Sequence, residues 1–346
     1  MANYFFIFVL IFIFFYIFFR LAPTRRKKEI KEIISDLEEL KKNEKYRKPA
    51  EDNIIFFRSA QTVLKYIWWL FFIAPKMRRK KEELLELADL PLPKWQKETH
   101  LRLTKLEKLS FPGLIKPIKK EIIKNLLRIK KTKKDPLILL NAGSGGAELE
   151  GQVLNELFIK KFDLPIIFIC VEISPHILEI GIDNINKNIP YLYKKKIKIK
   201  KLDKINYLIL EDLKKEAAVD KKNIIVFLNN NIFSLNNGLL SGSIDLIYHS
   251  RLRHHLTIKE QNDLEKLEIF LSSRIIEFDD FCSIPVFIFP SIITWRWPVT
   301  LNGAILSYLR DFSKKELLSF KEKKGWRLIM YKNLGYYLMI YDESKK

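Results

Sequence analysis

Cysteine is scarce in this chain of 346 residues, which contains only Cys170 and Cys282. The two are far apart and each stands in an apolar run. They therefore exclude a disulfide framework and a zinc cluster, and a reducing compartment suits the chain. We expect no metal site.

Acidic residues are also in deficit, with 41 Asp and Glu against 62 Lys and Arg, which gives a net charge of +21. Such an excess usually indicates an anionic partner, although background drift in composition is an alternative. Only 15 of the 62 are Arg, the residue that reads bases and clamps phosphates with two bonds. The balance favours a charged surface over base readout, so a nucleic-acid partner is not expected.

Charge is absent from residues 4–19, which read YFFIFVLIFIFFYIFF. With its neighbours this run approaches the ~20 apolar residues that span a bilayer. No basic residue precedes it and Pro23 follows Ala22, so an uncleaved anchor over residues 1–22 is favoured over a signal peptide. Basic residues follow at 25–28, and such residues stay on the cytoplasmic side. We expect a single-pass membrane protein with its N-terminus outside and the rest in the cytosol.

A second apolar stretch, at residues 62–74 (TVLKYIWWLFFIA), is too short to span a bilayer comfortably and carries Lys65. Trp68 and Trp69, flanked by basic residues, suit a helix that lies in the headgroup region. A buried helix of the soluble part is the alternative.

Residues 23–134 are basic and mostly helical in pattern. Residues 101–134 alone carry twelve Lys and Arg against two acids. Within 113–134 an apolar face recurs at helical spacing, formed by Ile118, Ile122, Leu126 and Ile129.

After Asp135-Pro136 the pattern changes to short apolar runs that alternate with helical segments. The expected strands are 137–140, 166–171, 224–228, 244–248, 274–278, 326–331 and 336–341. Continuous apolar strands separated by helices predict an α/β domain over 135–346, with a sheet covered on both faces. The short gap at 332–335 predicts a C-terminal antiparallel hairpin, and the Lys-rich 194–204 is interpreted as a solvated excursion.

A glycine loop follows the first expected strand and reads Asn141-Ala-Gly143-Ser144-Gly145-Gly-Ala147. Glycines let the backbone approach a ligand and turn sharply into a helix. Glu148 stands where a dinucleotide fingerprint needs a small residue, so the loop suits a ligand without phosphates. At the end of the second strand, Glu172 can accept both hydroxyls of a ribose.

The fourth strand leads into a basic, histidine-rich segment, 242–256, that reads GSIDLIYHSRLRHHL. Together with the glycine loop and the Glu172-Ile-Ser-Pro stretch, it resembles the class I S-adenosylmethionine-dependent methyltransferases over about residues 135–342. The resemblance implies a Rossmann-like, mostly parallel sheet and S-adenosylmethionine as cofactor. A membrane-anchored methyltransferase is the function that follows.

The resemblance also implies roles for individual residues. The loop would lie under the methionine part of the cofactor, Glu172 would hold the ribose, Ile173 would pack on the adenine, and Asn231 would accept from the adenine amino group. The loop residues concerned are Asn141, Gly143, Ser144 and Gly145. Asn141 replaces the usual acid and Ala147 a common glycine, so a non-catalytic scaffold with this fold is one alternative.

A base is needed when the acceptor is a hydroxyl or a protonated amine, and His249, His254 and His255 are the candidates. A structural role for the histidine pair is the alternative. Arg251 and Arg253 could hold a carboxylate or phosphate of the acceptor.

The base-methylating enzymes' motifs are missing after the fourth strand, which disfavours a nucleobase acceptor. Residues 283–309 are long, apolar and aromatic, and in the family this region forms the acceptor lid. An O or N (or C) atom of a small lipophilic or lipid acceptor is therefore expected. A protein or RNA methyltransferase recruited by basic helices is the rival enzyme.

Overall fold

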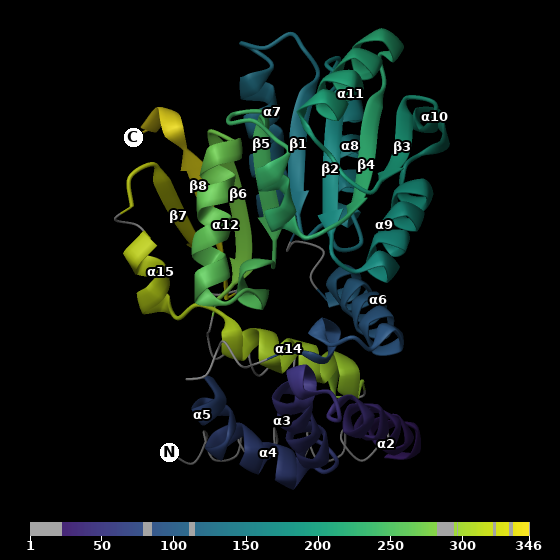
Figure 1. Cartoon of the computed structure of the whole chain (residues 1–346), viewed down its shortest axis with the longest axis vertical. Helices are drawn as coiled ribbons and strands as arrows, with labels where there is room; N and C mark the ends of the chain where they lie inside the picture. Colours follow the sequence, from purple (N-terminus) through teal and green to yellow (C-terminus); the bar gives the residue numbers. More distant parts are fainter. Residues whose placement is uncertain are drawn as a thin grey trace, which may run out of the picture. The chain divides into compact units, whose positions relative to one another are not determined.

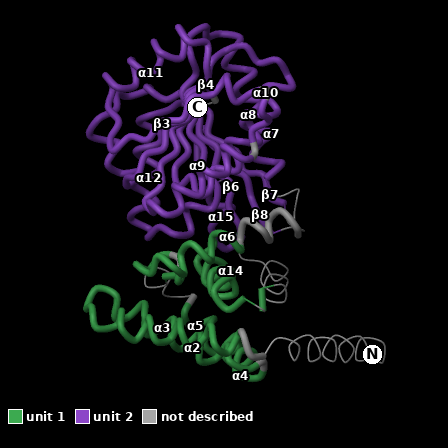
Figure 2. Tube along the Cα trace, turned by 90° about the vertical axis from the view of Figure 1, so that its right-hand side faces the viewer, with its two compact units in different colours: residues 1–102, 281–311 green, residues 103–280, 312–346 purple. Residues whose placement is uncertain are grey.

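The computed structural model describes residues 23–78, 85–110, 115–281, 294–295, 297–320, 323–331 and 335–345. It divides into two compact units (Figure 2). The helical unit comprises residues 1–102 and 281–311, and the sheet unit comprises residues 103–280 and 312–346. The anchor expected over residues 1–22 lies outside the described residues. In the described part of the chain, no helix has the length and apolar character needed to cross a membrane.

The described residues of the sheet unit form eight strands in the order β3-β4-β2-β1-β5-β6-β8-β7. The strands are β1 Leu137–Ala142, β2 Ile166–Glu172, β3 Ile197–Leu202, β4 Asn223–Asn229, β5 Leu246–Ser250, β6 Arg274–Asp280, β7 Trp326–Tyr331 and β8 Tyr336–Asp342. Strands β1 to β6 pair in parallel, whereas β8 runs antiparallel to both β6 and β7. The mostly parallel α/β sheet with a C-terminal antiparallel hairpin is confirmed.

Helices cover both faces of this sheet, as the apolar strands require. Every residue of β1 and β2 is buried, the pattern of a parallel sheet without a solvated face. One core layer contains α7 (Lys116–Ile129), α8 (Glu148–Ile159) and α9 (Pro175–Asn188). The other contains α11 (Tyr207–Asp220) and α12 (Ile258–Leu271), which Figure 1 shows on the opposite face from α7 and α8. The remaining helices of the unit are α10 Tyr191–Lys194, η4 Ile232–Asn237, η5 Arg253–His255, α15 Lys314–Phe320 and η6 Glu343–Lys345.

Helix α7 buries the apolar face expected from its sequence spacing, Ile118, Ile122, Leu126 and Ile129. These side chains pack in the same core as β1 and α8. Residues 103–134 group with the sheet in one compact unit.

The interpretation of 194–204 as a solvated excursion is wrong, because residues 197–202 form the edge strand β3. Lys198 and Lys200 both pair with Glu216 of α11. Lysines on an edge strand discourage pairing with another chain, so the charge here reflects the position of the strand in the sheet.

The helical unit joins the N-terminal helices to the segment that follows β6. Its helices are α2 Pro23–Leu40, η1 Glu44–Tyr46, α3 Arg47–Ser59, α4 Val63–Phe72, α5 Ala74–Arg78, η3 Leu87–Asp89, α6 Pro93–Ser110 up to Arg102, and α14 Pro298–Arg310. Apolar side chains of α14, among them Leu301 and Ile305, share a core with Ile30, Phe56 and Trp69. This shared core is why residues 281–311 group with the N-terminal helices.

Polar contacts also fix α14 in the helical unit. Asn302 Nδ2 donates to Asn53 Oδ1 at 2.7 Å, and Asn302 Oδ1 accepts from the Leu87 backbone N–H at 2.9 Å. Because Asn302 is fully buried, both bonds are needed to offset the desolvation of its amide.

Candidate functional site

The glycine loop connects the carboxyl end of β1 to α8 by a backbone that few side chains tolerate. Gly143, Gly145 and Ala147 all have positive φ, at 66°, 53° and 51°. A Cβ on Gly143 would lie 2.9 Å from Leu252 Cδ1, so a side chain there would also require Leu252 to move. Ser144 N donates to Val171 O at 2.9 Å, which holds the loop against the end of β2.

Glu172 ends β2 and its carboxylate is held by two backbone groups. Its Oε2 accepts from Gly145 N at 3.1 Å and its Oε1 accepts from Ser174 N at 3.0 Å. Burial raises the pKa of Glu172, and the Ser174 and Gly145 N–H groups partly oppose that rise. Each oxygen has one further lone pair, so the carboxylate can accept two more hydrogen bonds from a diol.

The backbone beside Glu172 is fixed by β4. Asn229 Nδ2 donates to the carbonyl oxygens of Glu172 and Ile173, at 2.9 and 3.0 Å. The Ile173 side chain is 69% exposed, so it offers an apolar surface next to the carboxylate. Asn231 is exposed, and its side-chain oxygen accepts from Phe233 N at 3.0 Å as the N-cap of η4. That oxygen keeps a second lone pair for a ligand.

Asn141 contacts a buried acid that sequence reasoning missed. Its Nδ2 donates to Glu150 Oε1 at 2.5 Å, and the Tyr248 hydroxyl donates to the same oxygen at 2.6 Å. Glu150 is fully buried in the first turn of α8, and burial raises its pKa. Residue 141 is not an acid, but Glu150, nine residues further along the chain, places a carboxyl group within hydrogen-bond distance of it.

Three buried polar atoms near the loop have no hydrogen-bond partner among the described residues. They are Asn141 Oδ1, Ser144 Oγ and Glu150 Oε2. Buried polar groups are nearly always bonded, so orphans at a glycine loop point to a ligand or water there. The donor set, neutral amide and hydroxyl groups with a carboxylate, suits a polar ligand that carries an amine and hydroxyls.

The histidine pair lies at the same edge of the sheet, in η5. His254 Nδ1 is 2.8 Å from Asp279 Oδ1 of β6, and the rings of His254 and His255 are 4.2 Å apart. His255 also lowers the pKa of Glu172 electrostatically, so it lies near the carboxylate. Burial disfavours the ionised form of Asp279, but His254, the Asp280 N–H group and His255 together outweigh it and the pKa of Asp279 is lowered.

Asp279 was also missed in the sequence. The signal that could have found it is an acid pair, Asp279-Asp280, at the end of an apolar strand, since parallel strands bring their carboxyl ends to one edge.

His249 and Arg253 lie in a buried ionic cluster. His249 Nε2 is 3.2 Å from Glu268 Oε1, and Arg253 Nη2 is 2.7 Å from Glu277 Oε2. Tyr337 completes the cluster by donating to Glu277 Oε1 at 2.6 Å. His249 is 0% and Arg253 1% exposed, so neither presents a surface that an acceptor could touch.

Arg251 adopts a left-handed backbone, with φ 58°, and its Nε is 3.2 Å from Asp280 Oδ2. Burial raises the pKa of Asp280 and the Arg251 guanidinium opposes this. The structure thus brings Arg251 to the edge that holds the histidine pair.

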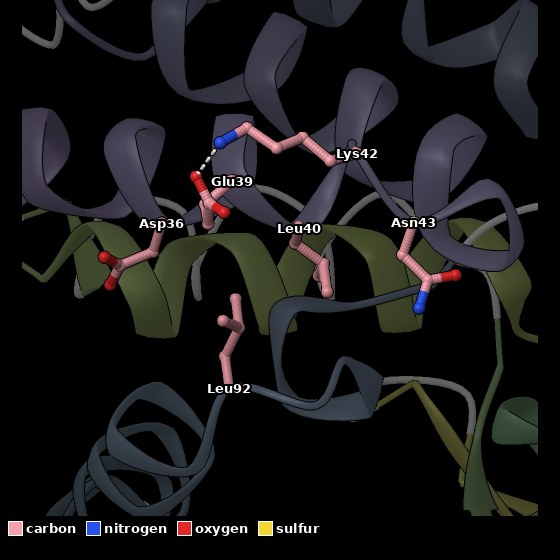
Figure 3. A pocket seen from close by; sticks show the side chains of 6 residues that line it. All are labelled: Asp36, Glu39, Leu40, Lys42, Asn43 and Leu92. Carbon is pink, nitrogen blue, oxygen red and sulfur yellow. Dashed lines mark hydrogen bonds and ion pairs between the residues drawn. The ribbon is translucent and has the colours of Figure 1, made fainter.

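A hollow of about 500 Å³ lies in the helical unit (Figure 3). Its lining consists of Asp36, Glu39, Leu40, Lys42, Asn43 and Leu92. Lys42 pairs with Glu39, three residues before it, and Asp36 accepts from Trp95 Nε1 at 2.6 Å. Its charged groups already have protein partners, and none of the predicted site residues lines it.

No family model matches the sequence and no curated protein matches it. Among solved structures, the plantazolicin methyltransferase in complex with a triazolic desmethylplantazolicin analogue and SAH is 10% identical, with a TM-score of 0.44. The match covers 78% of this chain and 98% of that one.

The magnesium protoporphyrin IX methyltransferase from Synechocystis PCC 6803, with bound SAH, is 12% identical with a TM-score of 0.37. That match covers 65% of this chain and 80% of that one. The CurJ carbon methyltransferase is 10% identical with a TM-score of 0.42, over 91% of this chain and 70% of that one. What each of these proteins binds or acts on is a property of that protein.

The sheet itself defines the class of fold. Apart from the edge strand β3, its order of parallel strands and its C-terminal antiparallel hairpin are those of the class I S-adenosylmethionine-dependent methyltransferases. The chain has a methyltransferase-type Rossmann-like fold.

Proposed function

We propose that the chain is an S-adenosylmethionine-dependent methyltransferase that transfers a methyl group to an O or N (or C) acceptor. The observation that carries the proposal is the Glu172 carboxylate, fixed at the carboxyl end of β2 by the backbone of the glycine loop. Such a carboxylate is suited to a ribose diol.

The loop and its surroundings fit the cofactor in chemistry. The orphaned oxygens of Asn141 and Ser144 can accept from an amine or hydroxyl donor, and Ile173 offers an apolar surface to an adenine. Gly143 and Gly145 keep the backbone free of side chains at the loop. When bound, S-adenosylmethionine supplies an activated sulfonium methyl group, so much of the rate comes from aligning the acceptor.

The histidine pair supports the handling of an acceptor proton. An Nδ1–H that donates to Asp279 leaves Nε2 as the basic nitrogen of His254, which is the arrangement a general base needs. His255 is half-buried beside it and is the second candidate. Asp279 would act as a positioning residue, because it fixes the tautomer of its neighbour.

We further propose that the acceptor is small and lipophilic, and that the protein acts on the cytosolic face of a membrane. The apolar run 4–19 and the apolar, aromatic segment 283–309 support this proposal. Protein or RNA methylation and a non-catalytic scaffold are the alternatives. Arg253 is buried and paired with Glu277, which weakens the expectation that it binds an anionic group of the acceptor.

Calorimetric titration of S-adenosylmethionine into the full-length chain tests the proposal. We expect binding, with at least a tenfold loss in Glu172→Gln and no loss in Glu179→Gln, an exposed acid on α9. Absence of binding at millimolar cofactor would overturn both enzyme proposals. Label from the methyl group is then followed into lipid, protein and RNA fractions, and a protein or RNA product would overturn the lipophilic acceptor.

A further inference from the structure

Helix α4 of the helical unit is divided lengthwise between core and solvent. Tyr66 and Trp69 are buried in the core of that unit, next to Phe56. The opposite face carries Leu64, Trp68, Phe71 and Phe72, which are between 57% and 74% exposed. Their spacing, i, i+4, i+7 and i+8, places all four on one side of the helix. The two sequence-based interpretations of residues 62–74 each describe one face of α4.

This exposed face is too large to be an ordinary surface feature. Four large apolar side chains form one stripe, and the Trp68 and Phe72 ring centroids lie 5.8 Å apart. Exposed apolar side chains are usually scattered singly, and a contiguous patch indicates a partner or a membrane.

The start of α2 lies beside α4, which helps to identify the partner. Arg26, in the first turn of α2, donates from Nε to Trp295 O at 2.8 Å, and its guanidinium lies 4.0 Å from the centre of the Trp295 ring. The Tyr66 ring of α4 packs on the same tryptophan, with centroids 5.2 Å apart. The chain therefore enters the described part of the helical unit next to α4, directly after the apolar run 4–19.

Exposed basic side chains accompany the apolar stripe. Lys65 lies on α4 itself, Lys76 on α5, and Lys27 and Lys28 in the first turns of α2. An apolar face that includes a tryptophan, with exposed lysines on the same helix and in the same unit, matches the interface of an anionic leaflet, where rings sit at headgroup level and lysines reach phosphates.

We propose that the exposed face of α4 lies in the interfacial layer of an anionic bilayer, beside the point where the predicted anchor leaves it. The proposal rests on the membrane attachment proposed above and deepens it. The anchor tethers the chain, and α4 fixes how the helical unit stands on the membrane. Two contacts with the bilayer, one spanning and one interfacial, restrict the rotation that a single tether would leave.

The test uses the full-length chain on vesicles of phosphatidylcholine with about one third phosphatidylserine, and a phosphatidylcholine brominated near the headgroup as quencher. We expect tryptophan emission to be quenched, and Trp68→Phe to abolish most of the quenching. Trp326→Phe, which removes a tryptophan from β7 of the sheet unit, is the matched control and should leave the quenching nearly unchanged. Equal quenching in wild type and Trp68→Phe would overturn the proposal.

A second variant separates the helix from the anchor. Phe71→Glu with Phe72→Glu should reduce Trp68 quenching several-fold while the protein still sediments with the vesicles. Ile159→Glu with Val219→Glu, at positions as exposed in the sheet unit, should change neither readout. Cross-linking of Leu64→Cys into dimers without Trp68 quenching would overturn the proposal in favour of a second copy. Cofactor calorimetry on the same samples reports on the proposed enzyme independently.

Discussion

The side-chain amide of Asn141 donates to Glu150 Oε1 at 2.5 Å, and both residues are buried. The same oxygen accepts from the Tyr248 hydroxyl at 2.6 Å, so β1, α8 and β5 meet at one carboxyl group. The two bonds to Oε1 offset part of the desolvation of this carboxyl group. Because Asn141 directly precedes Ala142 and Gly143, the bond links the start of the glycine loop to the buried Glu150.

We expect Glu150→Gln to change how stability depends on pH. Burial raises the pKa of Glu150 in the folded protein, whereas the unfolded value is about 4.3. The folded state therefore binds this proton more tightly, and its contribution to stability is full below the unfolded pKa and lost as pH rises through the folded pKa. Glutamine keeps the acceptor and has no proton to lose.

The measurement is denaturant unfolding of wild type and Glu150→Gln between pH 4 and pH 8. The variant should gain stability relative to wild type as pH rises, by about 1.4 kcal/mol for each unit by which the pKa is raised. Glu179→Gln, at an exposed position of α9, controls for the loss of a charge. Parallel curves for wild type and Glu150→Gln would show that the buried carboxyl does not titrate differently in the two states.

Gly143→Ala should lose more stability than Gly242→Ala. Both glycines have nearly the same positive φ, 66° and 67°, so both substitutions cost about 1 kcal/mol from backbone strain. Only at Gly143 does the new Cβ meet another atom, Leu252 Cδ1 at 2.9 Å, whereas nothing lies within 4 Å at Gly242. Thermal unfolding measures both losses, and calorimetry should find weaker cofactor binding only in Gly143→Ala. Equal losses of stability in Gly143→Ala and Gly242→Ala would contradict the close approach of Leu252 to residue 143.

Arg253→Met should destabilise the protein by about 3–5 kcal/mol, because it leaves the buried Glu277 carboxylate without its cation. Adding Glu277→Gln to that variant should restore part of the loss. Lys323→Ala breaks an ion pair with Glu265 at 2.8 Å in which the lysine is 44% exposed, and should cost less than about 1 kcal/mol. Urea unfolding at neutral pH measures the loss of stability in Arg253→Met, in the double variant and in Lys323→Ala. A loss in Arg253→Met as small as that in Lys323→Ala would argue against a buried charge pair.

Local patterns in the sequence were sufficient for the buried strands of the sheet and insufficient for its edge strand β3. Apolar runs located β1, β2 and β4 to within about two residues, since parallel strands bury every side chain. The strand β3 was missed because its lysines pair with Glu216 of α11, which no local pattern reveals.

The sequence likewise predicts some residues of the candidate site and not others. The position of Glu172 is predictable because it ends an apolar strand. Glu150 and Asp279 act through partners on other elements, so only the tertiary structure identifies them. The sequence makes His249 a candidate base. In the structure its nearest acid is Glu268 of α12, and both side chains lie in a buried ionic cluster.

The contact between His254 and Asp279 gives the last prediction. Burial alone would raise the pKa of Asp279, and His254, the Asp280 N–H group and His255 together outweigh it, so the folded pKa lies below the ordinary value of about 3.9. A lowered carboxyl pKa stabilises the fold above the unfolded pKa, and that stability is lost as pH falls through the folded pKa. In His254→Gln, burial is opposed less and the pKa of Asp279 rises. The stability difference between wild type and variant should therefore be largest near neutral pH and shrink as pH falls toward 4. His255→Gln, which keeps the bond between His254 and Asp279, should show a difference that varies less with pH. If the two variants gave the same pH dependence, Asp279 would not be held ionised by His254, and the case for Asp279 as a positioning residue would be lost.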